Sequence, residues 1–235
     1  MALQTSGAIS LSDIEGEFGG SPPTAISEYY GVAAGVPTSG TIDLADFYGT
    51  SKPPPAITYR GSLKSAGTTN SQTRYLAVGR VFVLGYQVNV GTISCTVGGV
   101  GATQIAFYTV GGADNEIRYW YRDITSAGNY TITMTGSGGS RLDSLVGVYQ
   151  APLYAPYSID TLTTSTNSQQ SVIFFSATVN DGAAIPTGTI TRRYYADIRS
   201  NEYVWHGEKV GATTLTSNST FSSGTNHRTI IISNP

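Results

Sequence analysis

A short phrase that occurs twice within the first fifty residues constrains this chain more than any other feature. The first copy is TSGAISLSDIEG at residues 5–16, and the second is TSGTIDLADFYG at residues 38–49. A shorter echo, TAISEYYG, lies between them at residues 24–31. Repetition of this kind constrains the architecture of a chain before any other pattern does.

Each full copy contains the pattern of a capped helical turn. Ser10 precedes Asp13 by three residues, and Asp43 stands in the same relation to an acid at 46. This spacing approximates a capping box, in which two acceptors satisfy free backbone N–H groups of the first turn. The isoleucine before each cap suits a hydrophobic staple. The run from cap to glycine covers only about one to two turns, which is too short for a stable isolated helix.

The apolar side chains of these turns therefore need a surface to pack against. We interpret the segment as a docking element that inserts them into a partner. The alternative is a subdomain that packs on the protein's own body. The residues expected to dock are Ile9, Leu11, Ile14, Phe18, Ile42, Leu44, Phe47 and Tyr48.

The same segment resembles a sequence that recurs in structural proteins of tailed-bacteriophage virions. The resemblance rests on SGAISLSDIEGEFGG, ISEYYG and SGTIDLADFYG and covers residues 5–50. In the second full copy, Asp43 takes the place of Ser10, which keeps an acceptor at the cap. The resemblance implies a virion protein, and it leaves open where on the particle the protein lies. Synthesis in the host cytoplasm is expected from the N-terminus and from the lack of a long apolar stretch, both described below.

Composition indicates an all-β protein with little charge. Only 12% of the residues are charged, the net charge is −2, and the chain contains 28 glycines and 16 tyrosines. This balance gives no reason to expect nucleic-acid binding or attraction to an anionic membrane. Low charge and abundant aromatic residues suit packing against other subunits. We therefore expect a homo-oligomer, and the resemblance to phage fibres implies a trimer.

The single cysteine and the N-terminus add two expectations. Cys95 has no partner for an intrachain disulfide, and its neighbours indicate a buried thiol in a strand. The N-terminus lacks the basic and apolar regions of a signal peptide. No apolar stretch approaches the length that crosses a bilayer, so we expect no membrane insertion.

A proline-rich linker at residues 51–55 separates the repeat segment, residues 1–50, from the rest of the chain. Residues 53–55 are consecutive prolines, which favour extended geometry. From residue 56 to 235 the chain shows short strand-like runs divided by glycine turns. This spacing predicts a β-sandwich or jelly roll. The runs TVGGVGAT, EIRYWYRDITSAGNYTITMT and SLVGVYQAP are similar to a jelly-roll module of phage fibres and bacterial surface proteins.

The sequence offers little for catalysis, and we expect neither an enzyme nor a cofactor. Glu202 and His206 are four residues apart, but in a strand this spacing separates them by about 13 Å, so we predict no metal site. The sequence contains no HExxH, GxSxG or P-loop motif. The remaining carboxylates show no diagnostic spacing for glycan cleavage.

Aromatic clusters in the body are the better candidates for recognition. Exposed tyrosine and tryptophan rings stack on sugars and anchor protein interfaces. Because alternate residues of a strand point to opposite faces, we expect Trp120 and Tyr195 to face outward as candidate recognition residues.

These observations predict a tail-associated fibre or baseplate component that contributes to host attachment. Its partners would be other virion proteins, further copies of itself, and a glycan or protein of the host surface. A capsid decoration or head-fibre protein is the alternative, and a glycan-cleaving fibre is a weaker one.

Overall fold

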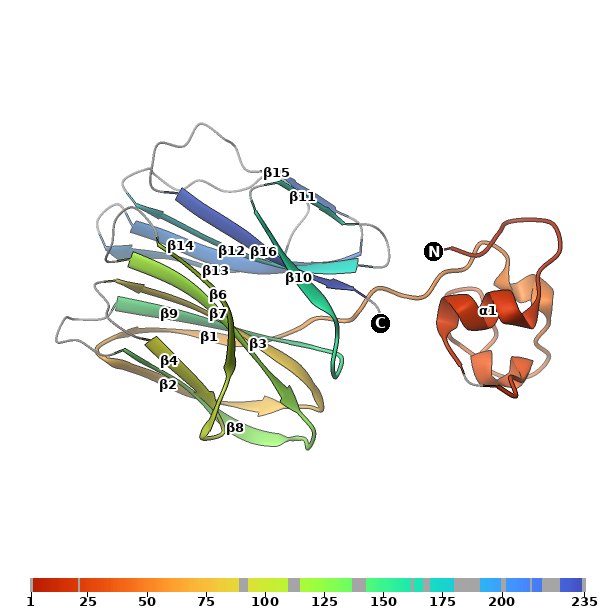
Figure 1. The fold of residues 1–235 in the computed structure, drawn as a ribbon, viewed down its shortest axis with the longest axis horizontal. Coiled ribbons are helices and arrows are strands. Elements are labelled where there is room, and N and C mark those ends of the chain that lie inside the picture. Colours follow the sequence, from red (N-terminus) through yellow and green to blue (C-terminus); the bar gives the residue numbers. More distant parts are fainter. Residues whose placement is uncertain are drawn as a thin grey trace. The chain divides into compact units, whose positions relative to one another are not determined.

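The computed structural model describes residues 2–20, 22–88, 93–109, 115–136, 143–161, 163–166, 170–179, 191–199, 202–211, 213–216 and 225–233. The chain forms two compact units, Met1–Pro54 and Pro55–Ser233 (Figure 1). The division falls within the proline-rich stretch. Strands make up 54% of the structure and helical turns 10%, which confirms the predicted all-β class.

The N-terminal unit consists of three capped turns. They are the helix α1 (Leu11–Phe18) and the 3₁₀ turns η1 (Ile26–Tyr29) and η2 (Leu44–Phe47). In each turn, the carboxylate at the third position accepts the N–H of the cap residue. The three bonds are Ser10 N to Asp13 Oδ2 at 2.8 Å, Ala25 N to Glu28 Oε1 at 3.3 Å and Asp43 N to Asp46 Oδ2 at 2.9 Å.

The shorter repeat in the middle, residues 24–31, therefore has the same capped-turn structure as the two full copies. Aligned on their caps, the three copies span residues 3–16, 18–31 and 36–49. The residue four places after each cap is the buried one: Ile14, Tyr29 and Phe47 are 0, 3 and 0% exposed. Val36 completes this core, and the ring of Phe18 lies 6.2 Å from that of Phe47. Each copy thus contributes one large side chain to a shared core.

The copies are also joined into a closed ring by the residue five places after each cap. Glu15 of the first copy accepts the Thr24 hydroxyl of the second at 3.0 Å. Tyr30 of the second donates to the Gly40 carbonyl of the third, and Tyr48 of the third donates to the Gly7 carbonyl of the first. Side chains at one repeated position therefore link the first copy to the second, the second copy to the third and the third copy to the first.

The first nine strands of the body form a jelly roll. Their pairing is nested: β1 pairs with β9, β2 with β8, β3 with β7 and β4 with β5, as in a long hairpin rolled up on itself. The strands are β1 (Thr58–Ala66), β2 (Thr69–Leu76), β3 (Gly79–Val88), β4 (Ile93–Val97), β5 (Val100–Gly101), β6 (Thr103–Thr109), β7 (Asn115–Ile124), β8 (Gly128–Gly136) and β9 (Asp143–Ala151).

Two sheets result from this winding, and a third sheet is added by the rest of the chain. The central sheet has the order β1-β9-β3-β7-β6, and the outer sheet has the order β2-β8-β4-β5. The third sheet has the order β10-β16-β12-β14-β13, and β11 pairs with β15 beside it. These strands are β10 (Tyr157–Thr161), β11 (Thr163–Thr166), β12 (Gln170–Val179), β13 (Thr191–Arg199), β14 (Glu202–Val210), β15 (Thr213–Thr216) and β16 (Thr225–Ser233).

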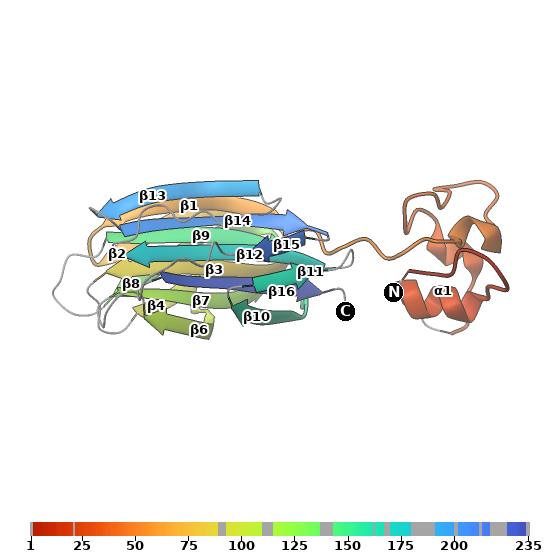
Figure 2. The ribbon, with the colours of Figure 1, turned by 90° about the horizontal axis from the view of Figure 1, so that it is seen from above.

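The central sheet is covered on both faces. Figures 1 and 2 show the third sheet stacked on it with nearly aligned strands, and the outer sheet on its opposite face. In β3, Phe82 and Leu84 pack against the third sheet, whereas Val81 and Val83 pack against the outer sheet. A strand buried on both faces is apolar throughout, which explains the long apolar run that begins at residue 81.

Candidate interaction surfaces

Two of the residues expected to dock into a partner are instead the centre of the N-terminal core. Ile14 and Phe47 are fully buried within their own unit. The docking expectation is therefore wrong for these two side chains. The physical reason is that three short turns, each unstable alone, supply one another with the apolar surface that we had assigned to a partner.

The other six residues expected to dock are placed in three different ways. Tyr48 is half-buried and bonded to the first copy. Leu44 is 36% exposed, although Leu11 and Ile26, its equivalents in the other copies, pack against the core. Leu44 is thus the apolar residue of this set that the unit presents outward. Those packed at the edge of the core are Ile9, Leu11, Phe18 and Ile42.

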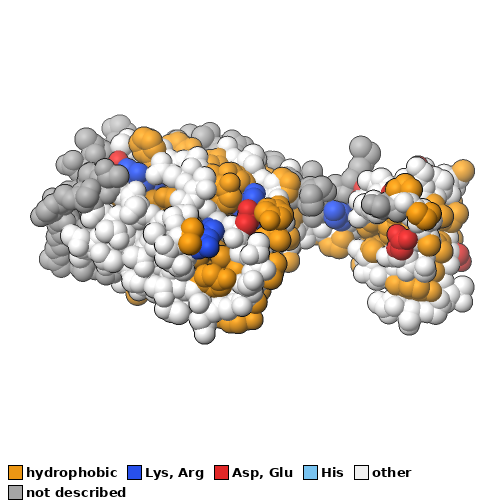
Figure 3. All heavy atoms as spheres, turned by 60° about the horizontal axis from the view of Figure 1, so that its bottom comes forward, with side chains coloured by type: hydrophobic (Ala, Val, Ile, Leu, Met, Phe, Trp, Pro, Cys, Tyr) orange, Lys and Arg blue, Asp and Glu red, His pale blue; other side chains and the backbone are white. Residues whose placement is uncertain are grey.

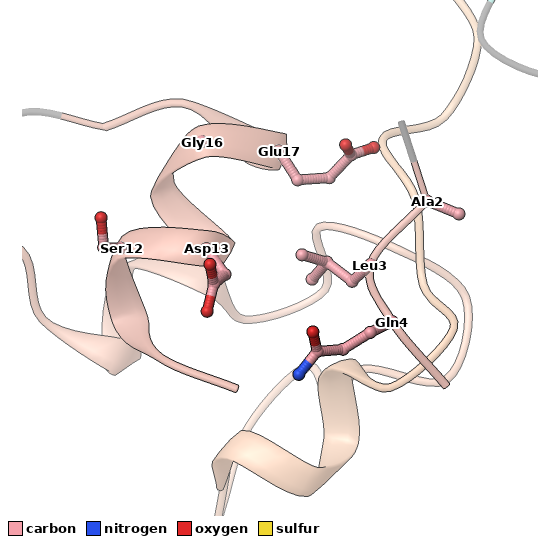
Figure 4. Close-up of a pocket in the computed structure, with 7 residues that line it drawn as sticks. All are labelled: Ala2, Leu3, Gln4, Ser12, Asp13, Gly16 and Glu17. Carbon is pink, nitrogen blue, oxygen red and sulfur yellow. The ribbon is translucent and has the colours of Figure 1, made fainter. Parts of the chain in front are cut away.

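A groove of about 380 Å³ lies between the N-terminal segment and α1 (Figure 4). Ala2, Leu3 and Gln4 form one wall, and the α1 residues Ser12, Asp13, Gly16 and Glu17 form the other. A Cβ added at Gly16 would lie more than 4 Å from any neighbouring atom outside its own helix, so the helix wall is open at this point.

The two carboxylates of the groove are engaged in holding the unit together. The Ser10 hydroxyl donates to Asp13 at 2.6 Å, and this bond, followed by that of the Ser10 N–H, lowers the pKa of Asp13. Glu17 accepts the backbone N–H of Lys52 at 2.8 Å. The groove is therefore a preformed, weakly acidic surface with two apolar residues, Ala2 and Leu3, in its wall.

The body carries few charged side chains on the face drawn in Figure 3, where apolar groups are scattered among polar ones. Trp120 does not belong to this exposed surface. It is 2% exposed and packs between the central and outer sheets, so the expectation that it faces outward is wrong. Its strand, β7, lies in the sheet that is covered on both faces. The side chain of Tyr195 lies outside the described residues.

His206 is a core residue of the body. It is fully buried between the central and third sheets and shares a hydrogen bond with the Tyr149 hydroxyl at 2.5 Å. Gly147 leaves room for the imidazole, because a Cβ there would lie 2.9 Å from its Nε2. Burial lowers the pKa of His206 to about 3, so the ring is neutral at physiological pH. The side chain of Glu202 lies outside the described residues.

An ion pair stands beside this histidine. Arg193 donates to Glu208 at 2.6 Å, and its guanidinium lies 5.4 Å from the centroid of the Tyr59 ring. Burial, and next the charge of Glu208, raise the pKa of Tyr149. Since Tyr149 and His206 are inaccessible, the arrangement stabilises the interface between two sheets and offers no entry to a substrate.

Sequence reasoning could not have found these partners. Tyr149 and His206 are 57 positions apart, and nothing in either local pattern indicates that two sheets bring them together. The buried thiol was easier to predict, because the prediction required only the residues next to it in the same strand. Cys95 is 4% exposed and burial raises its pKa to about 12, as expected of a structural thiol.

Within the described part of the chain, no three metal-ligating side chains cluster. In the same ranges, no helix is both long and apolar enough to cross a bilayer. Comparisons of the chain with protein-family models, curated proteins and solved structures found no match.

Proposed function

We propose that this chain is a structural protein of a tailed-phage virion, associated with the tail as a fibre or baseplate component. In this proposal the N-terminal unit attaches the protein to the particle, and the jelly-roll body contributes to host attachment. The resemblance of residues 5–50 to virion proteins and the jelly-roll fold support it.

The observation that carries the proposal is the separate core of the N-terminal unit. Its buried apolar side chains come from its own three copies, and the boundary to the body lies at Pro54. A repeat segment with its own core suits a module that attaches as a preformed unit. Docking would then use outward residues, namely Leu44 and the groove beside α1, and leave the core intact.

Particle purification tests the proposal. Virions are purified on a density gradient from a lysate of the phage that encodes the chain, and the protein is quantified by mass spectrometry. We expect it in the particle band at a fixed ratio to the major capsid protein. Absence from purified particles would refute the proposal.

A substitution then tests the docking surface. Leu44 is the first residue of η2, where an acid is favourable, so Leu44→Asp should leave the melting temperature unchanged while it weakens incorporation. Val100→Asp, at a residue 53% exposed on the body, is the matched control and should incorporate normally. Normal incorporation of Leu44→Asp would remove this residue from the docking surface.

A further inference from the structure

The turn between β9 and β10 carries an exposed tyrosine in an unusual backbone conformation. The Ala155 N–H donates to the Pro152 carbonyl at 3.2 Å and closes the turn. Tyr154 has φ 56°, and among the residues that the structure describes it is the one non-glycine residue at positive φ. Glycine and asparagine are the residues that ordinarily occupy such positions, so a bulky residue there carries strain.

No hydrogen bond or ring contact of the Tyr154 side chain explains why a tyrosine occupies this position. It is 62% exposed, and it makes no hydrogen bond or ring contact with any described residue. Strain of this kind concentrates at binding sites, and the exposed part of the ring is accessible to a ligand.

Arg80, at the start of β3, holds the turn in position. Its backbone N–H donates to the Pro152 carbonyl at 3.2 Å, and its Nη1 donates to the Ala155 carbonyl at 2.8 Å. The rest of the guanidinium forms a two-pronged pair with Asp123, at 2.8 Å from Nε and 2.7 Å from Nη2. The turn is therefore tied to β3 and β7, and Tyr154 is presented from a rigid base.

Two more tyrosines surround this arginine. The Arg80 guanidinium lies 4.5 Å from the ring centroid of Tyr121 and 5.7 Å from that of Tyr157. Both rings are half-buried, and neither hydroxyl has a hydrogen-bond partner among the described residues. The backbone of the Tyr154 turn is bonded to the same arginine, on both sides of Tyr154, and we call Arg80, Tyr121, Asp123, Tyr154 and Tyr157 together the tyrosine platform.

The charges of the platform favour a neutral ligand. Arg80 is balanced by Asp123, so no free cation remains to attract a phosphate, sulfate or carboxylate. Each Asp123 oxygen accepts one bond from Arg80 and keeps a lone pair for a second donor. The phenol groups add further donors and acceptors, and an exposed ring face offers an apolar contact.

A pyranose matches this combination, because one face of the sugar exposes C–H groups and its rim carries hydroxyls. We propose that the tyrosine platform binds a neutral oligosaccharide, with the sugar face stacked on Tyr154 and its hydroxyls bonded to Asp123 and the tyrosine hydroxyls. This inference names neutral oligosaccharides as the class of ligand for the host attachment proposed above. The biological role of the site therefore rests on that proposed function.

The test is binding of the full chain to neutral oligosaccharides of glucose, galactose, mannose and N-acetylglucosamine, beside anionic ones that contain uronic or sialic acid. Titration calorimetry then measures the affinity of each oligosaccharide that binds. Tyr154→Gly is the informative variant, since glycine accepts the positive φ and the melting temperature should hold or rise. We expect its affinity to fall by about tenfold or more, as when a central aromatic contact is truncated.

Tyr75→Ala is the matched control, because Tyr75 is 59% exposed on β2 and should not affect binding. Three results would overturn the inference: no neutral oligosaccharide binds, only anionic ones bind, or Tyr154→Gly binds as the unchanged protein does. Particle incorporation of Tyr154→Gly is measured separately. Loss of sugar binding with normal incorporation supports the platform, whereas absence of the unchanged chain from particles refutes only the virion proposal.

Discussion

In the N-terminal unit, three copies of one turn each supply a single large side chain to one core, whereas in the body one sheet supplies side chains to two cores. Ile14, Tyr29 and Phe47 meet in the first arrangement. In the second, Val83 and Leu84 are neighbours in β3 yet belong to different cores. The comparison teaches that the stability of the small unit comes from a few core residues and the caps of its turns, whereas the stability of the body comes from stacked sheets.

The two units should also differ in how they lose stability. A unit the size of Met1–Pro54 buries a smaller fraction of its surface than a larger domain does. Each of its core residues therefore contributes a larger share of its folding stability. The predictions below test this difference, from the largest expected effect to the smallest.

Phe47→Ala should have the largest effect. Truncating a fully buried phenylalanine costs about 3–5 kcal/mol, which is comparable to the whole stability of a small unit. Calorimetry of the full chain should show two transitions, and the variant should lose that of the N-terminal unit. Leu44→Ala is the control and should change little, since Leu44 is exposed. If Phe47→Ala also shifted the transition of the body, the two cores would not be independent.

Acid should weaken the body through His206. Its pKa is about 3 in the folded protein, against an ordinary value of 6.5. Between these values the unfolded chain binds a proton that the folded protein does not, so stability falls as the pH drops below about 6.5. From pH 7.5 to 4.5 the loss from this group should be roughly 2–3 kcal/mol.

Urea unfolding of the body at several pH values measures this loss. In His206→Phe the same titration is absent, although the Tyr149 hydroxyl loses its partner at every pH. The unchanged protein should therefore be the more stable of the two at pH 7.5, and its advantage should shrink toward pH 4.5. A difference that stayed constant with pH would argue against the neutral buried imidazole.

The smallest effect concerns the cap that lacks a side-chain acceptor. Ser10 and Asp43 accept N–H groups of their turns, whereas Ala25, at the equivalent position, has no acceptor. Ala25→Ser should stabilise the N-terminal unit by about 0.5–1 kcal/mol, observed as a higher temperature of its transition. Ala45→Ser, inside η2 and exposed, is the control. If Ala25→Ser and Ala45→Ser changed the transition temperature equally, a serine at position 25 would not act as a cap, and the three copies would not be equivalent at their caps.

Local chemistry made part of this structure predictable. The capping pairs of the two full copies were expected from their spacing and are present, because a cap involves residues three positions apart. The all-β class, with a β-sandwich or a jelly roll as the two forms expected, followed from strand lengths and glycine turns. The middle copy was recognised only as an echo, because alanine at its cap hides the pattern.

What the sequence determined by itself is therefore local: where turns begin, which runs are strands, and which residues share a face of a strand. Tertiary structure alone decided which faces are covered. Trp120 is buried because the outer sheet packs over its face, and the other face of the same strand meets a sheet formed by residues after 156. The period of a strand records its two faces but not their neighbours, since burial depends on segments that the chain supplies many residues later.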